Sequence, residues 1–102
     1  MSKIGIGIIT CNRPEFLSKC VESIDASVGD EFIIINDGTS TVDIENIKVI
    51  KTEGKIGVGK SKNIALKYLY NHGCDFIFII EDDTIITDQR VFKEYIKASK
   101  KT

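Results

Sequence analysis

The sequence contains one proline, one histidine and no tryptophan in 102 residues, and it has no long apolar run. Because a membrane-spanning helix needs about 20 consecutive apolar residues, no such span is predicted. The lack of proline-rich or low-complexity stretches also excludes a disordered linker. A formal charge of −1 provides no positive field, so nucleic acid is not an expected partner. The composition is that of an ordinary globular protein, and the length predicts one domain over residues 1–102.

Cysteine is scarce as well and shows no motif. Cys11, Cys20 and Cys74 form no Cys-x-x-Cys pair, so their spacing predicts neither a zinc site nor a disulfide framework. One bridged pair stays open as an alternative, but reduced thiols are the simpler expectation and favour a cytoplasmic location. His72 is expected at the end of a helix, so no nucleophilic Cys–His pair is predicted.

Short apolar runs rich in isoleucine, valine and phenylalanine recur along the chain. They cover residues 3–10, 31–36, 47–52 and 75–82. Near-continuous runs of this kind are typical of strands that are buried on both faces of a parallel sheet. We therefore expect four strands.

Between these runs the apolar residues recur at helical spacing. The stripes cover residues 14–28, 64–72 and 91–96. Asn12 is expected to cap the first helix, and Gly73 to end the second. The alternation of strands and helices predicts an α/β fold, with a Rossmann-like, mostly parallel sheet of about four strands flanked by helices.

Polar, turn-forming segments follow the predicted strands. They are residues 10–14, 36–40, 52–63 and 81–84. Because open α/β sheets bind ligands outside the carboxyl ends of their strands, these segments predict a ligand site. Asp37 in the second segment is a candidate acceptor for a ribose hydroxyl or a base N–H, although turn chemistry alone also explains its Asn-Asp-Gly context.

An acidic triplet, Glu81, Asp82 and Asp83, directly follows the last apolar run. Because side chains alternate along a strand, Glu81 and Asp83 are expected to point one way and Asp82 the other. Like charges this close need a cation or hydrogen-bond donors to compensate them. Carboxylate oxygens together with phosphate oxygens suit Mg²⁺ or Mn²⁺. A solvated turn is the alternative interpretation.

The segment from Gly54 to Ser61 reads GKIGVGKS and matches the phosphate-binding P-loop pattern G-x-x-x-x-G-K-[ST]. A small P-loop-like nucleoside-triphosphate-binding protein is therefore one alternative. In a competing interpretation, Gly57 and Gly59 let the loop pass close to a nucleotide while Lys60 or Lys62 neutralises phosphate. A non-catalytic α/β binding domain is a further alternative.

Taken in order, the four strand ends resemble those of GT-A glycosyltransferases, and of family 2 in particular. The chain reads IITCNRPEFLSKCVESI where that family has a Thr/Ser-x-Asn pattern before its first helix. INDGTS corresponds to an Asp-Asp-Gly-Ser pattern, and GVGKSKNIA corresponds to Ala-Arg-Asn-x-Gly, with Asn63 matching. The acidic triplet takes the place of an Asp-x-Asp motif. The resemblance covers nearly the whole chain, with the motifs in order and in spacing.

The resemblance implies a site for a nucleotide-diphosphate sugar, commonly a UDP-sugar, built from all four strand ends. Its residues would be Thr10, Asn12, Asp37, Gly57, Lys62, Glu81, Asp82 and Asp83. In this scheme Thr10 and its neighbours line the base pocket, Asp37 binds the base, and Lys62 lies near the nucleotide.

The resemblance also assigns roles within the acidic triplet. Glu81 or Asp82 would contact the ribose, and Asp83 would coordinate the Mn²⁺ or Mg²⁺ that bridges the diphosphate. That metal stabilises the charge that develops on the leaving group.

Departures from the family pattern leave the donor open. Asn36 replaces its first aspartate, Lys62 an arginine and Ala65 a glycine. The resemblance covers only the nucleotide-sugar-binding half, so the chain is expected to lack the acceptor-binding half and the catalytic base. Whether it is an active hexosyltransferase by itself, and which acceptor it uses, stay open. An exposed surface where the other half would pack favours self-association.

Overall fold

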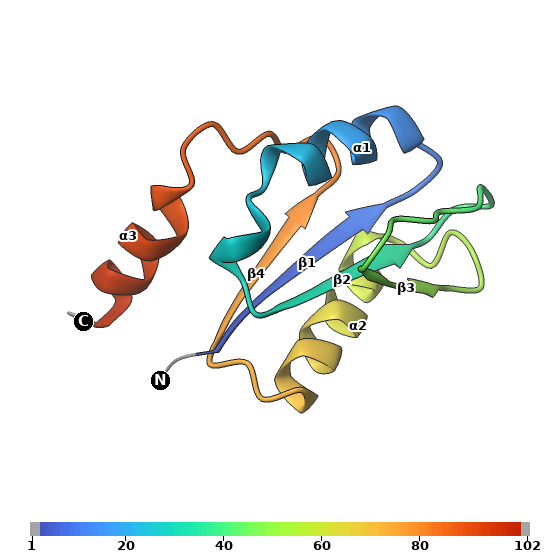
Figure 1. Cartoon of the computed structure of the whole chain (residues 1–102). Coiled ribbons are helices and arrows are strands. Elements are labelled where there is room, and N and C mark those ends of the chain that lie inside the picture. Colours follow the sequence, from blue (N-terminus) through green and yellow to red (C-terminus); the bar gives the residue numbers. More distant parts are fainter. Residues whose placement is uncertain (1–2, 101–102) are drawn as a thin grey trace.

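Four parallel strands form a sheet in the order β3-β2-β1-β4 (Figure 1). They are β1 (Ile4–Thr10), β2 (Glu31–Asn36), β3 (Lys48–Lys51) and β4 (Phe76–Glu81). This computed structural model describes residues 3–100, including their side chains except those of residue 26 and residues 97–100. All pairings among the described strands are parallel. The predicted α/β fold with a mostly parallel sheet of about four strands is confirmed.

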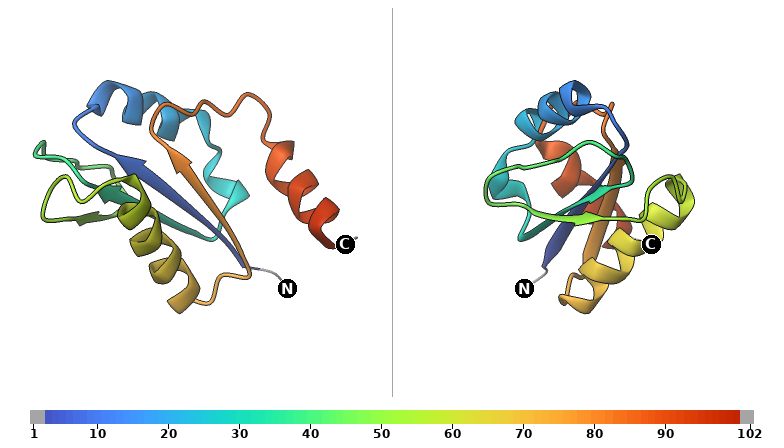
Figure 2. Two further views of the ribbon diagram at one scale, coloured as in Figure 1. Left: turned by 180° about the vertical axis from the view of Figure 1, so that it is seen from behind. Right: turned by 90° about the vertical axis from the view of Figure 1, so that its right-hand side faces the viewer.

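In the described part of the chain, three α-helices flank the sheet: α1 (Pro14–Ser23), α2 (Val58–Asn71) and α3 (Arg90–Lys100). Helices α1 and α2 lie on opposite faces of the sheet, as both views of Figure 2 show. Phe92 of α3 belongs to the same buried cluster as Leu17 of α1, so α3 packs on the α1 side. Within residues 3–100, no helix is long and apolar enough to cross a membrane.

The first helix is shorter than its apolar stripe predicts. Helix α1 ends at Ser23, and residues 26–28 form a separate 3₁₀ turn, in which the Ser27 amide donates to the Asp25 carboxylate at 2.9 Å. The predicted capping role of Asn12 is also wrong. Arg13 occupies the N-cap position. Asn12 has a left-handed backbone with φ of 55°, and its side-chain oxygen accepts hydrogen bonds from the amides of Thr39 and Ser40 instead.

Strand β1 is buried on both faces. Ile6 and Ile8 pack in the cluster on the α1 side, and Ile9 packs in the cluster on the α2 side. Gly5 and Gly7 also face α2, where a Cβ on Gly5 would lie 2.7 Å from the sulfur of Cys74 and one on Gly7 would lie 3.1 Å from the Cβ of Ala65. The two glycines therefore allow α2 to pack close to the sheet.

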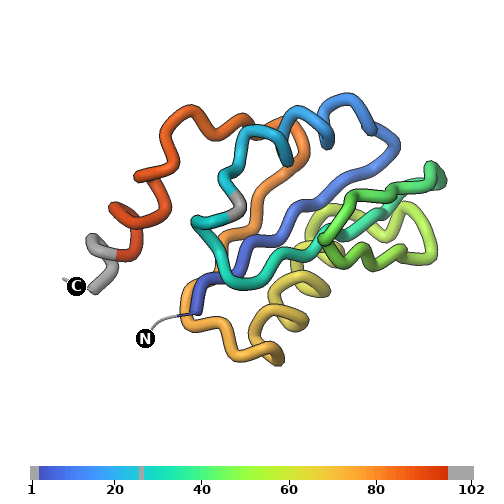
Figure 3. Tube along the Cα trace, in the orientation of Figure 1, coloured from blue at the N-terminus to red at the C-terminus, as the bar shows by residue number. Residues whose placement is uncertain are grey.

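The strand register places the polar segments at one end of the molecule. Thr10 is paired with Asn36 and Asn36 with Lys51, while Ile9 is paired with Glu81. The tube trace in Figure 3 shows the connections after all four strands leaving the sheet at this end. The expectation that the polar segments gather at the carboxyl edge is met by this arrangement.

Replacing Gly5 by valine is expected to destabilise the protein by about 1 to 3 kcal/mol, because the added methyl groups overpack the contact with α2. Urea unfolding measures the change. Gly59→Ala in the first turn of α2 is the control, since no atom lies within 4 Å of the added Cβ and alanine is favoured over glycine in a helix. Equal midpoints for Gly5→Val and the wild type would show that α2 does not depend on this close approach.

Candidate functional site at the carboxyl edge of the sheet

Strand β1 marks the point at which the strand order reverses. The chain leaves β1 through α1 to reach β2 on one side, and it returns after α2 to form β4 on the other side. Such a switch point is where open α/β sheets bind ligands. Residues 11–13 after β1 and residues 82–84 after β4 flank it.

Asp82 is buried at this switch point, with 1% of its surface exposed. The hydroxyl of Thr10 donates to Asp82 Oδ2 at 2.8 Å, and the guanidinium of Arg13 forms an ion pair with Asp82 Oδ1. The backbone N–H of Asp82 donates to the carbonyl of Ile9 at 3.1 Å. Asp82 therefore joins the end of β4 to the loop after β1, and the Thr10 hydroxyl is already engaged within the protein.

Arg13 is the residue at this point that the sequence motifs missed. It is one of only two arginines in the chain, and its guanidinium also lies 5.2 Å from the centre of the Phe16 ring. The sequence does place an arginine in the loop after β1 and an acidic triplet at the end of β4. These two segments meet only because β1 and β4 are neighbours in the sheet, and the sequence alone does not give that order of strands.

In the acidic turn, Glu81 and Asp83 are exposed whereas Asp82 is buried, and this alternating exposure agrees with the strand alternation expected from the sequence. The turn is closed by a hydrogen bond of 3.0 Å from the Thr84 amide to the Glu81 carbonyl. Among residues 3–100, the Asp83 carboxylate has no hydrogen bond or ion pair with another side chain. Asp83 is thus open to a ligand, as is the exposed carboxylate of Glu81, whereas Asp82 is not.

A divalent cation fits this site only together with a ligand. The described part of the chain contains no group of three His, Cys, Asp or Glu side chains that would hold a metal by itself. Mg²⁺, however, is usually held by one or two carboxylates with substrate phosphates and water, and Mn²⁺ also suits oxygen ligands. The exposed oxygens of Asp83 are donors of this kind, so they suit a cation that arrives with a diphosphate.

Asp37 organises a second part of the edge. It is 5% exposed, and its carboxylate accepts hydrogen bonds from the Thr52 hydroxyl at 2.5 Å and from the amides of Ile56 and Gly57 at 2.9 and 3.0 Å. The Thr52 hydrogen bond is the largest cause that lowers the pKa of the Asp37 carboxyl, and the two amides lower it further. Asp37 therefore holds the glycine loop after β3 against the end of β2.

These hydrogen bonds disfavour the P-loop alternative. In a P-loop, the backbone amides of the glycine-rich loop cradle phosphate. Here the amides of Ile56 and Gly57 point at the Asp37 carboxylate instead, which takes the place of an anion. Gly57, with φ of 101°, is the N-cap of α2. The letters of the pattern are present, but the loop is closed on a side chain of the same protein.

Asn12 and Asn36 shape the loop between these two parts. The Asn12 side-chain oxygen accepts the amides of Thr39 and Ser40 at 2.8 and 3.0 Å. The Asn36 amide group donates to the Ser40 carbonyl at 2.8 Å, a bond that a carboxylate could not make. Asn36, which stands where the family pattern has an aspartate, thus has a structural role in this chain.

The two lysines that were candidates for phosphate binding lie on α2, after the glycine loop. Lys62 is half-buried on α2 and Lys60 is exposed.

Burial, followed by the charges of Asp82 and Asp83, raises the pKa of the Cys20 thiol to about 11. Cys20 is therefore a thiol at neutral pH and not a nucleophile, as the sequence predicts.

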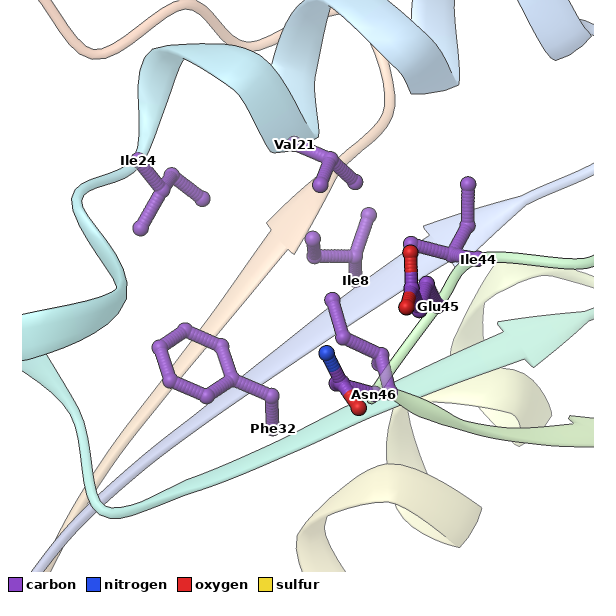
Figure 4. Close-up of a pocket in the computed structure, with 8 residues that line it drawn as sticks. Ile8, Val21, Ile24, Phe32, Ile44, Glu45 and Asn46 are labelled. Atoms are coloured by element: carbon purple, nitrogen blue, oxygen red, sulfur yellow. The ribbon is translucent and has the colours of Figure 1, made fainter.

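A pocket of about 280 Å³ lies elsewhere, on the α1 side of β1 and β2. It is lined by Ile8, Val21, Ile24, Phe32, Ile44, Glu45, Asn46 and Ile47 (Figure 4). Most of these side chains are apolar, and none belongs to the strand-end segments that carry the carboxylates. The pocket therefore lacks the chemistry for a charged nucleotide, and the candidate site is the carboxyl edge.

Asp37→Asn is expected to lower the urea midpoint at pH 7 and to speed hydrogen exchange at the Ile56 and Gly57 amides. Because folding lowers the pKa of Asp37, its carboxylate stabilises the protein above the unfolded value of about 3.9. That contribution is lost as pH falls through the lower folded value, so the variant and the wild type should converge there. Asp43→Asn, at an exposed carboxylate, is the control, and a gap that stayed constant down to pH 3 would contradict the role of the charge.

Comparison with known families agrees with the resemblance in the strand-end motifs. The sequence model of the family described as "Glycosyl transferase family 2" matches residues 6–101. No curated protein matches the chain. The matched range contains all four strand ends and the acidic turn. A family 2 sequence and a Rossmann-like parallel sheet with the acidic turn at its switch point lead to one conclusion: the chain belongs to glycosyl transferase family 2 and has the α/β arrangement of its GT-A domain.

Proposed function

We propose that the protein binds a nucleoside-diphosphate sugar, a UDP-sugar first of all, together with Mn²⁺ or Mg²⁺, for transfer of the sugar to an acceptor hydroxyl. The observation that carries the proposal is the exposed Asp83 carboxylate, placed at the switch point by a turn whose neighbour Asp82 is buried. Membership of glycosyl transferase family 2 supports the reaction class.

Asp83 and the cation act on the diphosphate in this proposal. The cation, when bound, neutralises the charge that develops on the nucleoside-diphosphate leaving group. The task of Asp83 is to hold that cation at the edge of the sheet, and exposed Glu81 beside it is available to a ribose hydroxyl. Catalysis of this kind depends on positioning and electrostatics more than on covalent chemistry by the protein.

The base of the nucleotide is assigned to the edge near Asp37. Its Oδ2 accepts one hydrogen bond, from Gly57, and a carboxylate oxygen can accept a second, such as one from a uracil N–H. Thr10 and Asn12 flank this edge from β1, and Lys62 lies on α2 after the glycine loop. Binding of the base at Asp37 would then also affect the glycine loop after β3, because Asp37 accepts hydrogen bonds from the amides of that loop.

The proposal assigns no catalytic base among the carboxylates that follow Thr84 in the described residues, which are Asp88 and Glu94. The Asp88 carboxylate accepts a hydrogen bond from the Arg90 amide at 3.0 Å and pairs with the Arg90 guanidinium at the start of α3. Glu94 lies exposed on the same helix. Neither is placed at the switch point.

Asp83→Asn is expected to weaken UDP binding about 10-fold or more in the presence of Mn²⁺, because the amide is a poor ligand for the cation. Calorimetric titration of UDP and a panel of UDP-sugars, with and without Mn²⁺, measures the effect. ATP is the control ligand and Asp43→Asn the control variant. If the wild type bound ATP but not UDP, or if Asp83→Asn kept wild-type affinity, the proposal would be overturned.

Self-association is part of the proposal and is assigned to the edge of β4. The opposite edge, β3, carries exposed Lys48 and Lys51, a charge pattern that protects edges from pairing. Strand β4 reads FIFIIE and has neither lysine nor proline. A second copy is the proposed partner, because one edge can pair with itself antiparallel about a two-fold axis.

Ile79→Pro is expected to lower the self-associated fraction measured by light scattering over a concentration series. The Phe76 and Asp82 amides point at β1, so strand alternation directs the Ile79 N–H away from β1 and proline breaks no backbone hydrogen bond to β1. Urea unfolding checks that the variant is folded, because the Ile79 side chain also packs on the α2 side. Val49→Pro is the matched control on the β3 edge, since the Thr52 amide points at β2. A wild type that is monomeric at all concentrations would contradict this part of the proposal.

A further inference from the structure

Arg13 has no role in the function proposed so far, although it lies at the switch point. Its side chain is 45% exposed, whereas that of its ion-pair partner Asp82 is 1% exposed. An arginine on a loop beside a ligand site could face solvent freely, but this one is directed at a buried carboxylate. The ion pair therefore connects the loop after β1 to the acidic turn after β4.

Asp82 is the fixed point of the acidic turn. Its backbone is attached to Ile9 of β1 and its two carboxylate oxygens to Thr10 and Arg13. Asp83 is the next residue in a turn that the Thr84-to-Glu81 hydrogen bond closes. The location of the Asp83 carboxylate therefore follows from the anchoring of Asp82, because nothing else within residues 3–100 holds the Asp83 side chain.

Charge explains why the anchor needs a cation. A buried carboxylate without a partner is strongly unfavourable, and Asp82 also has Glu81 and Asp83 beside it. Without the guanidinium, Asp82 would gain by turning towards water, and the turn would move with it. Arg13 itself is well supported, because its backbone forms the N-cap of α1 and its guanidinium lies over the Phe16 ring.

We propose that Arg13 is a positioning residue: by pairing with Asp82 it holds the acidic turn against the loop after β1, so that Asp83 meets the metal and diphosphate in a fixed place. The inference rests on the proposed binding of a nucleoside-diphosphate with a divalent cation. In this role Arg13 acts through Asp82 and does not itself touch the ligand. Asp82, likewise, belongs to the framework of the site and not to the ribose contact that the family resemblance implies.

A double-mutant cycle distinguishes this role from direct binding of phosphate by Arg13. The variants are Arg13→Gln, Arg13→Lys, Asp82→Asn and the double variant Arg13→Gln/Asp82→Asn. Lys19→Gln on the exposed side of α1 is the control that removes the same charge. For each protein, calorimetry gives the UDP affinity at saturating Mn²⁺, and urea unfolding confirms that it is folded at the temperature of the titration.

The expected result is a loss of UDP affinity of about 10- to 100-fold for folded Arg13→Gln, the range typical of residues that orient a metal ligand. Arg13→Lys should recover most of it because the charge is kept, and Lys19→Gln should bind like the wild type. In the Asp82→Asn background, Arg13→Gln should have little further effect, since the pair is already broken.

Two outcomes would overturn the inference alone. One is wild-type affinity in folded Arg13→Gln. The other is an equal loss from Arg13→Gln in both backgrounds, which would mean that Arg13 contacts the diphosphate directly. A wild type that binds no UDP at any Mn²⁺ concentration would instead overturn the proposed function, and the positioning role would fall with it.

Discussion

The burial of β1 on both faces is the constraint on which the rest of the structure depends. β1 pairs with β2 on one side and with β4 on the other, so its end, Thr10, lies between the polar segments that follow those two strands. Its two faces differ: Ile6 and Ile8 fill the α1 side, while Gly5 and Gly7 leave room for α2. Because both faces of β1 are covered, polar side chains that contact water can lie only at the ends of the strand. The carboxyl edge of the sheet is where those groups meet.

Two buried carboxylates then make that edge a rigid surface. Asp37 joins the end of β2 to the loop after β3, and Asp82 joins the end of β4 to the loop after β1. Each carboxylate is stable in its buried place because donors from a distant segment compensate its charge. A ligand at the edge would therefore meet side chains that are already held in position, which lowers the ordering cost of binding. The same arrangement leaves the Asp83 side chain without a partner within residues 3–100, since Asp82 makes the contacts that hold the turn.

Much of the fold followed from local patterns. The strands lie within one residue of the four apolar runs, because a run buried on both faces needs no partner to be recognised. The alternating exposure of Glu81, Asp82 and Asp83 agrees with the strand alternation expected from the sequence. The capping role of Asn12 was mispredicted because the hydrogen bonds of its side chain go to Thr39 and Ser40, which are distant in sequence. A local rule for helix caps takes no account of such competition.

The sequence by itself determined the α/β class, the gathering of the polar segments at the carboxyl edge and membership of glycosyl transferase family 2, because these depend on patterns that each segment carries alone. Only the tertiary structure decided what the carboxylates do. A P-loop and the glycine loop held by Asp37 share the same letters, and the difference lies in a side chain about 20 residues away. Likewise, Asp82 and Asp83 are adjacent and chemically identical, but Arg13 and Thr10 reach only the first. Hydrogen bonds and ion pairs are satisfied by proximity in space, and proximity between segments is set by the order of the strands in the sheet.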